Sequence, residues 1–307
     1  MSGSISDAVR NSTTEYLSNG WTVKCGFIRN GFLQRRRPNQ MRRKSLTGGR
    51  GRVTPGFSTA SRLRGGGGGG GSGVAAGGSG AAVAYDAVAM IVQDLGTVPY
   101  RQAWAEQERA HADVLAGGAE RLLLVEHPPV ITLGRRPGLA RNVLASADAL
   151  ARAGVDVVES DRGGDVTFHG PGQVVAYPIV RLADHRLSVS GYVHRLEDIL
   201  IATLADLGIA ARKDAEAVGV WADDAGRLAK VAAIGVRIRR GVSMHGVALN
   251  VTTDLGFFDL IVPCGLWGRP VTSVRRLLGD QAPPPRDVAT ALARRMTEAF
   301  APACAPP

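Results

Sequence analysis

The chain has 307 residues, with 37 Lys and Arg against 27 Asp and Glu, and a formal net charge of +10. The positive charge is concentrated at one end, because residues 1–84 carry a net +11 and the remaining 223 residues carry −1. Nucleic-acid binders usually spread such charge over a folded surface, so this distribution argues against nucleic-acid binding by residues 85–307.

Residues 1–84 have the composition of a disordered, basic, Gly-rich tail. They hold 19 of the 40 glycines and long stretches of them lack apolar periodicity. Such a segment cannot bury enough apolar surface to offset the entropy of ordering, and we expect a flexible linker over 65–80. The tail fits a transit peptide, which would send the protein to mitochondria, a phosphate-binding basic arm, or translated upstream sequence without a function.

Residues 85–307 suit one sizeable domain. A helix is predicted over 100–115, and short strands over 122–125, 130–133, 155–158, 166–168 and 173–180. A second helix opens at Ser190 and stops at Gly208, followed by strands over 218–221, 228–239 and 242–251. Helices from Ser273 to 278 and over 287–300 close the chain. This order predicts a mixed α/β (α+β) fold without regular βαβ alternation.

The three cysteines, Cys25, Cys264 and Cys304, have the spacing of neither a disulfide framework nor a metal cluster. A reducing, cytoplasmic compartment and a site without metal are therefore expected. No apolar run approaches the roughly 18 residues of a membrane span, so we expect no contact with a membrane.

Residues 162–173 form the first unusual string, RGGDVTFHGPGQ. Its four glycines, one proline and one histidine predict a loop whose backbone can approach a ligand closely. A plain turn is the alternative, because Gly-Pro-Gly is common at turns.

A thiol and an amine are the next candidates. Cys264 lies on a Pro-Cys-Gly turn after an apolar run, where a thiol can be reached. Lys230 is an ammonium in a strand of small apolar residues, which does not suit a solvent-facing strand. Such a lysine near a thiol can act as a base or stabilise the thiolate. The alternatives are an inert buried cysteine and a lysine that extends to solvent.

The string VSMHGVALN, residues 242–250, contains His245, a candidate base or a structural histidine. Gly246 and Ala248 are expected on one strand face, where small side chains leave a groove for an elongated apolar ligand.

Together these strings resemble the lipoyl(octanoyl) transferase family, whose members carry an RGG-x-x-T-Y/F-HGPGQ loop, a K-x-x-[AS]-[IL]-G strand, an HG-x-ALN strand and a PCG cysteine. They stand here at 162–173, 230–235, 245–250 and 263–265. The similarity extends to EHPPVITLG at 126–134 and covers roughly residues 95–278. Phe168 departs from the family's usual tyrosine.

The resemblance implies the fold of the biotin/lipoate ligase catalytic domain. It also implies transfer of an octanoyl (or lipoyl) group from acyl carrier protein to a lysine of lipoyl domains, in 2-oxoacid dehydrogenases and the glycine cleavage H protein, without a cofactor. Cys264 would carry the acyl thioester, Lys230 would promote loss of its proton, and His245 would support proton transfer. The acyl and acceptor site would be lined by Arg162, Gly163, Gly164, Asp165, Val166, Thr167, Phe168, His169, Ala233, Ile234, Gly235, Gly246, Val247 and Ala248.

Two other functions remain open from the sequence. An ATP-dependent lipoate or biotin ligase of the same fold would need no nucleophilic cysteine, and a non-catalytic protein could bind nucleic acid through the basic tail. For the transferase, an acidic partner is expected to meet a local basic patch, formed by Arg237, Arg239, Arg240, Arg275 and Arg276.

Overall fold

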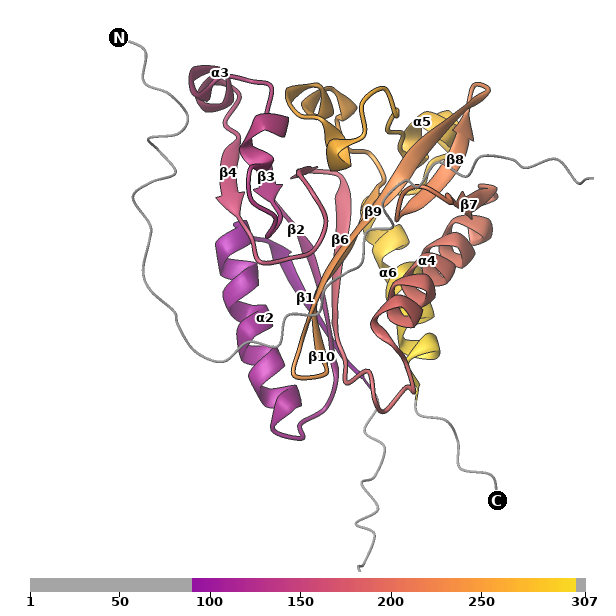
Figure 1. Ribbon diagram of the computed structural model, residues 1–307. Coiled ribbons are helices and arrows are strands. Elements are labelled where there is room, and N and C mark those ends of the chain that lie inside the picture. The colour runs from indigo at the N-terminus through magenta and orange to yellow at the C-terminus, as the bar shows by residue number, and fades with distance from the viewer. Residues whose placement is uncertain (1–89, 302–307) are drawn as a thin grey trace, which may run out of the picture. The chain divides into compact units, whose positions relative to one another are not determined.

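The computed structural model describes residues 90–301, which form two β-sheets with helices around them (Figure 1). The predicted tail over 1–84, the linker within it, Cys25 and Cys304 lie outside the described residues. The mixed α/β fold that we predicted is confirmed. Of the helices between residues 90 and 301, none combines the length and the hydropathy that a bilayer crossing requires.

The large sheet has seven strands in the order β1-β2-β6-β10-β9-β8-β7. Only β1 and β2 pair in parallel, and the other neighbours are antiparallel. Its strands are β1 (Ile91–Thr97), β2 (Arg121–Glu126), β6 (Gln173–Ile179), β7 (Ala211–Lys213), β8 (Val220–Asp224), β9 (Arg227–Arg239) and β10 (Val242–Asn250).

Helices cover both faces of this sheet (Figure 1). The side chains of α4 (Val189–Asp206) and α6 (Pro285–Ala299) join one face in the largest apolar core. Helix α2 (Tyr100–Leu115) packs on the other face, in a smaller core. Because strand side chains alternate between faces, each residue of β9 and β10 belongs either to the α4/α6 side or to the α2 side.

The small sheet has the order β4-β3-β5 and carries a core of its own. It consists of β3 (Val130–Leu133), β4 (Asp156–Glu159) and β5 (Thr167–His169), with α3 (Ala147–Arg152) and the 3₁₀ turn η1 (Leu139–Asn142) beside it. The remaining chain forms the 3₁₀ turns η2 (Leu255–Leu260), η3 (Pro263–Gly265) and η4 (Gly279–Gln281) and the helix α5 (Val274–Leu278).

Most predicted elements occur within a few residues of their expected bounds, and three differences have physical causes. Helix α4 begins at Val189 rather than Ser190, because the Ser188 hydroxyl accepts a hydrogen bond from the Gly191 N–H and caps the helix. Strand β1 was not predicted because almost all of its side chains are exposed, so it lacks an apolar pattern. Helix α3 was not predicted because it is very short. As a result, two parallel units, β1-α2-β2 and β3-α3-β4, were missed.

Proline interrupts the centre of the large sheet. Pro178 lies in β6 and has no N–H to donate, and the β6–β10 ladder extends only from Gln173 to Ala176. By this register His245 of β10 faces Pro178, and its backbone turns into the left-handed region with φ of 56°. The His245 N–H then donates to Gln107 Oε1 of helix α2 at 2.7 Å instead of to a strand.

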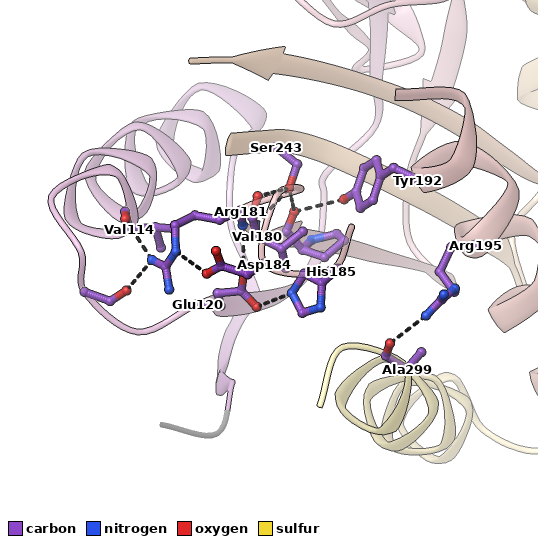
Figure 2. A network of polar contacts seen from close by, with 12 residues as sticks. Val114, Glu120, Val180, Arg181, Asp184, His185, Tyr192, Arg195, Ser243 and Ala299 are labelled. Carbon is purple, nitrogen blue, oxygen red and sulfur yellow. Dashed lines mark hydrogen bonds and ion pairs between the residues drawn. The ribbon is translucent and has the colours of Figure 1, made fainter. Parts of the chain in front are cut away.

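Beyond the proline, Ser243 rejoins the two chain segments through its backbone, whose N–H donates to Val180 O at 3.0 Å, and through its side chain. Ser243 is fully buried; its hydroxyl donates to Pro178 O at 2.7 Å and accepts from the Val180 N–H at 2.9 Å. Figure 2 shows this group beside Arg181, which donates to Val114 O and so holds the end of α2. Tyr192 of α4 also donates to Pro178 O, at 3.2 Å. These contacts fasten helices of both faces to this end of the sheet.

We predict that Ser243→Ala lowers the free energy of unfolding by about 1–3 kcal/mol, because the Val180 N–H loses a buried partner. Tyr192→Phe should cost less, since Pro178 O keeps its bond from Ser243. Urea unfolding of both variants measures the difference. Equal losses, or a larger loss for Tyr192→Phe, would contradict the role given to Ser243.

Candidate active site

A pocket enclosing about 280 Å³, part of it open to solvent, lies on the α2 face of the large sheet, next to β5 and η3. Inside it, Lys230 Nζ of β9 donates a hydrogen bond to Cys264 Sγ of η3 at 3.2 Å. The lining is formed by Thr167, Gln173, Lys230, Ala233, Ala248, Asn250, Phe258, Pro263, Cys264 and Val271. The cysteine and lysine from the two sequence strings are therefore in contact.

A β-bulge turns Lys230 toward this pocket. The β8–β9 register pairs Val220 with Ala232 and then Trp221 with Lys230, so Val231 is an extra residue on β9. Lys230 and Ala233 consequently share the pocket face, although they are three positions apart and regular alternation would place them on opposite faces. Lys230 is 5% exposed; its Nζ also donates to Val218 O at 3.0 Å and lies 4.8 Å from the Trp221 ring centroid. Among residues 90–301, no carboxylate pairs with it.

Backbone contacts hold Cys264 in an uncommon conformation. Its φ is 57°, and its N–H donates to Val166 O at 2.9 Å. Asp165 supports the same loop, since its carboxylate accepts hydrogen bonds from the Val166 N–H and from Asn142 Nδ2. The next residue, Gly265, is also left-handed, and an added Cβ there would lie 2.9 Å from Asp165 Oδ2. The thiol is partly exposed, so it is fixed in place and reachable.

Arg162 is a buried cation without a carboxylate partner among residues 90–301. It is 6% exposed, and its guanidinium donates to the hydroxyl and carbonyl oxygens of Thr132 and to Gly163 O. Burial lowers the pKa of its guanidinium. A buried charge without hydrogen-bond partners is costly, so Arg162 depends on these neutral oxygens.

A hydrogen-bonded row of side chains forms the polar wall of the pocket. His169 Nδ1 lies 2.7 Å from Gln173 Oε1, and Gln173 Nε2 donates to Phe168 O and to Asn250 Oδ1. Asn250 Nδ2 in turn donates to Thr272 O at 3.1 Å. Gln173 and Asn250 face each other across β6 and β10, so the sheet register itself brings them together.

His245 lies in a separate buried cluster and does not line the pocket. Its Nε2 lies 2.6 Å from Asp161 Oδ1 and its Nδ1 3.4 Å from Tyr100 Oη. Burial is the largest cause that lowers the pKa of His127 to about 4 and those of His169 and His245 to about 3. All three imidazoles are therefore neutral at pH 7.

The other residues of the expected acyl site have varied positions. Thr167, Ala233 and Ala248 line the pocket, whereas Ile234 and Val247 point to the α4/α6 core on the opposite face. Phe168 is fully buried and stacks on Phe257 at 4.7 Å between ring centroids. Of the two residues of the expected groove, Ala248 lines the pocket and Gly246 does not.

Glycines at this site allow close backbone approach. An added Cβ at Gly246 would lie 2.2 Å from Ala176 O, so this glycine is required by packing against β6. Gly235 and Gly163 bring β9 against the 162–164 loop, where the Gly163 N–H donates to Val236 O at 2.9 Å. The next residue, Gly164, has a φ of 92°, a backbone conformation that favours glycine.

Several lining residues were not proposed from the sequence: Gln173, Asn250, Phe258, Pro263 and Val271. Gln173 and Asn250 are the last residues of two of the sequence motifs, so their place in those motifs could have identified them as site residues. Phe258 and Val271 could not be found, because long-range contacts bring them to the pocket. Within residues 90–301, no group of three or more His, Cys, Asp or Glu could hold a metal ion.

The expected basic patch does not exist as one surface. Arg239 and Arg240 lie at the turn between β9 and β10, at the opposite end of the molecule from α5 with its Arg275 and Arg276 (Figure 1). Several of these arginines already have acidic partners: Arg237 pairs with Asp161, Arg275 with Asp280 and Arg276 with Asp224. The prediction was wrong because strand and helix positions were grouped without their spatial arrangement.

Comparison with known proteins adds three findings. Residues 99–297 match the family model described as the lipoyl protein ligase A/B catalytic domain. An octanoyltransferase of Chloroflexus aurantiacus is 47% identical over 69% of this chain and 94% of its own length, and one of Koribacter versatilis is 48% identical over 61% of this chain and 75% of its own.

Solved structures show the same fold. A lipoate-protein ligase A bound with ATP superposes with a TM-score of 0.59 at 17% identity, over 69% of this chain and 86% of the ligase. A structure from an archaeal lipoylation system, described as a bipartite lipoate protein ligase and its E2 lipoyl domain from Thermoplasma acidophilum, gives a TM-score of 0.54 at 16% identity, over 69% and 84% of the two chains.

We predict that Lys230→Met slows alkylation of Cys264 by iodoacetamide at pH 7 about tenfold, because the thiolate loses its adjacent cation. Intact-mass spectrometry measures the rate. Lys213→Met is the matched control, since Lys213 pairs with Asp198 and does not line the pocket. An unchanged rate in Lys230→Met would contradict the proposed influence of the ammonium on the thiol.

We also predict that the free energy of unfolding falls as the pH drops from 7 to 5. His127, His169 and His245 have lowered pKa values in the folded protein, so unfolding takes up protons once the pH is below about 6.5. Each contributes about 1.4 kcal/mol per pH unit below that value. Urea unfolding at several pH values measures the slope, which His127→Gln should reduce. A constant free energy over this range would contradict the prediction.

Proposed function

The chain belongs to the octanoyltransferases within the lipoyl protein ligase A/B catalytic-domain family, and we propose that it transfers octanoyl through a thioester on Cys264. The observation that carries this proposal is the 3.2 Å contact between Lys230 Nζ and Cys264 Sγ in a pocket with apolar lining. The enzyme is an acyltransferase of lipoate biosynthesis, and its acceptors are lipoyl-domain proteins.

In the first step, the Cys264 thiolate attacks the carbonyl carbon of octanoyl-acyl carrier protein. A bond forms between that carbon and Sγ, the carbonyl electrons move to oxygen, and they return as the carrier's C–S bond breaks. The released carrier thiolate takes up a proton, for which Lys230 is the nearest ammonium. One thioester replaces another, so the step needs no ATP.

In the second step, the ε-amine of a lipoyl-domain lysine attacks the same carbonyl carbon. A C–N bond forms, the C–Sγ bond breaks, and the amine loses a proton to become an amide. Lys230, left neutral by the first step, can receive this proton while Cys264 departs as the thiolate, which restores the starting pair of ammonium and thiolate. The lipoyl domains of 2-oxoacid dehydrogenases and the glycine cleavage H protein are the acceptors we propose.

The lining suits this acyl group. Ala233 and Ala248 face each other across β9 and β10, and their small side chains leave room for a ligand above the sheet. Phe258, Pro263 and Val271 add apolar walls. This mostly apolar lining suits the hydrocarbon chain of an octanoyl group.

An ATP-dependent ligase is the alternative with this fold. It would activate a free acid as an adenylate and would not use a cysteine nucleophile. The paired Cys264 and Lys230, and octanoyltransferases at 47–48% identity, favour the transferase.

We predict that incubation with octanoyl-acyl carrier protein, without ATP, adds one octanoyl group to Cys264. Intact-mass and peptide mass spectrometry locate the adduct, and neutral hydroxylamine should remove it because a thioester is labile. Cys264→Ser should abolish the adduct, whereas Cys304→Ser should retain it. No adduct on the wild type, or an adduct on another residue, would contradict the proposal.

A further inference from the structure

The backbone donors nearest to the nucleophile are already occupied. The N–H of Cys264 donates to Val166 O at 2.9 Å, that of Gly265 to Val262 O at 3.0 Å, and that of Leu266 to Pro263 O at 3.0 Å. Acyl transfer places negative charge on the carbonyl oxygen, and preorganised hydrogen-bond donors normally stabilise it. At Cys264 this stabilisation must come from elsewhere, and side chains that line the pocket are the nearest candidates.

The orientation of the Asn250 amide is fixed by its neighbours. Gln173 Nε2 must be the nitrogen, since it lies 3.1 Å from the carbonyl oxygen of Phe168. The same Nε2 also donates to Asn250, so the Asn250 atom that faces it is the oxygen. His169, which is neutral at pH 7, completes the assignment by donating from Nδ1 to Gln173 Oε1.

One N–H of Asn250 is therefore left for the pocket. Asn250 Nδ2 carries two hydrogens, and it donates one to Thr272 O at 3.1 Å. Within residues 90–301 the second has no acceptor, although Asn250 is only 5% exposed and lines the pocket with Cys264 and Lys230. Thr167 is placed similarly, because it lines the pocket and its hydroxyl has no hydrogen-bond partner in the described part of the chain.

Two features make Asn250 the stronger donor of the two. Its side chain is held at both ends, by Gln173 and by Thr272 O, so no reorientation is needed when charge develops. It also follows Ala248 by two residues on β10 and so faces the same side of the sheet. A hydroxyl such as that of Thr167 rotates freely and is less preorganised.

Resting on the proposed thioester mechanism, we infer that the free N–H of Asn250 donates to the carbonyl oxygen of the octanoyl group while Cys264 is attacked and while the acceptor amine attacks. As the C–Sγ bond forms, the carbonyl electron pair moves to oxygen and the Asn250 hydrogen bond strengthens. As the carrier's C–S bond breaks, the pair returns to the C=O bond and the leaving thiolate takes a proton. The second step passes through the same kind of oxyanion, and Asn250 serves both.

The test compares two reactions of the same thiol. Iodoacetamide alkylates Cys264 by displacement at a saturated carbon and forms no oxyanion, whereas octanoyl-acyl carrier protein acylates it through one. For Asn250→Ala, we expect single-turnover acylation to slow about 100-fold, as for loss of one oxyanion donor, with alkylation nearly unchanged. Asn250→Ser should give the same result, because the shorter serine side chain cannot reach the carbonyl oxygen. It leaves a smaller cavity than alanine does and replaces the alanine variant if that variant does not fold.

Ser243→Ala is the matched control, because it weakens the same strand at a buried site that does not line the pocket. It should leave both rates near those of the wild type. If acylation and alkylation fall by the same factor in the Asn250 variants, Asn250 only positions the cysteine and lysine, and the inference is overturned. Unchanged acylation overturns it as well. Absence of the octanoyl adduct in the wild type would instead refute the thioester mechanism.

Discussion

The contact between Lys230 and Cys264 is the constraint on which the site depends, because its partners come from a strand and a turn with no local connection. The lysine reaches the pocket only through the bulge at Val231, which changes the face that β9 presents. The cysteine is set by a left-handed turn anchored on Val166 O. The backbone conformation at the bulge and at the turn therefore determines where both reactive side chains begin and which way they face.

The electrostatics of the pocket follow from the same arrangement. Lys230 and Arg162 are both buried, and neither pairs with a carboxylate within residues 90–301. Each instead donates to neutral oxygens, the Val218 carbonyl for Lys230 and the Thr132 oxygens for Arg162. Neutral partners leave the positive potential available to an anion, whereas a carboxylate would cancel it. In the proposed mechanism, the anion that meets the Lys230 ammonium is the thiolate of Cys264.

Local sequence patterns predicted much of the fold and the composition of the site. The helix of residues 100–115 and strand 130–133 were predicted with the bounds observed, and Cys264 and Lys230 were selected from residue type and context. The errors concern register. The alternation of side chains predicted that Gly246 lines a ligand groove, whereas the close approach of β6 is what requires glycine there. No sequence pattern predicts the extra residue at Val231. Bulges and interrupted ladders are decided by pairing with distant strands, which one segment does not encode.

Pro178 gives the large sheet an internal edge. A central strand normally has every donor and acceptor engaged by its two neighbours, and proline there is usually a defect. In this protein the gap opposite His245 exposes a backbone N–H, and helix α2 takes it through Gln107. A backbone N–H in the middle of the sheet is thus free to bind a helix, in the way that the unpaired backbone groups of an edge strand can bind another strand. Because Pro178 has no N–H, the sheet contacts α2 at this point, and this contact helps to position the helix relative to β9 and β10.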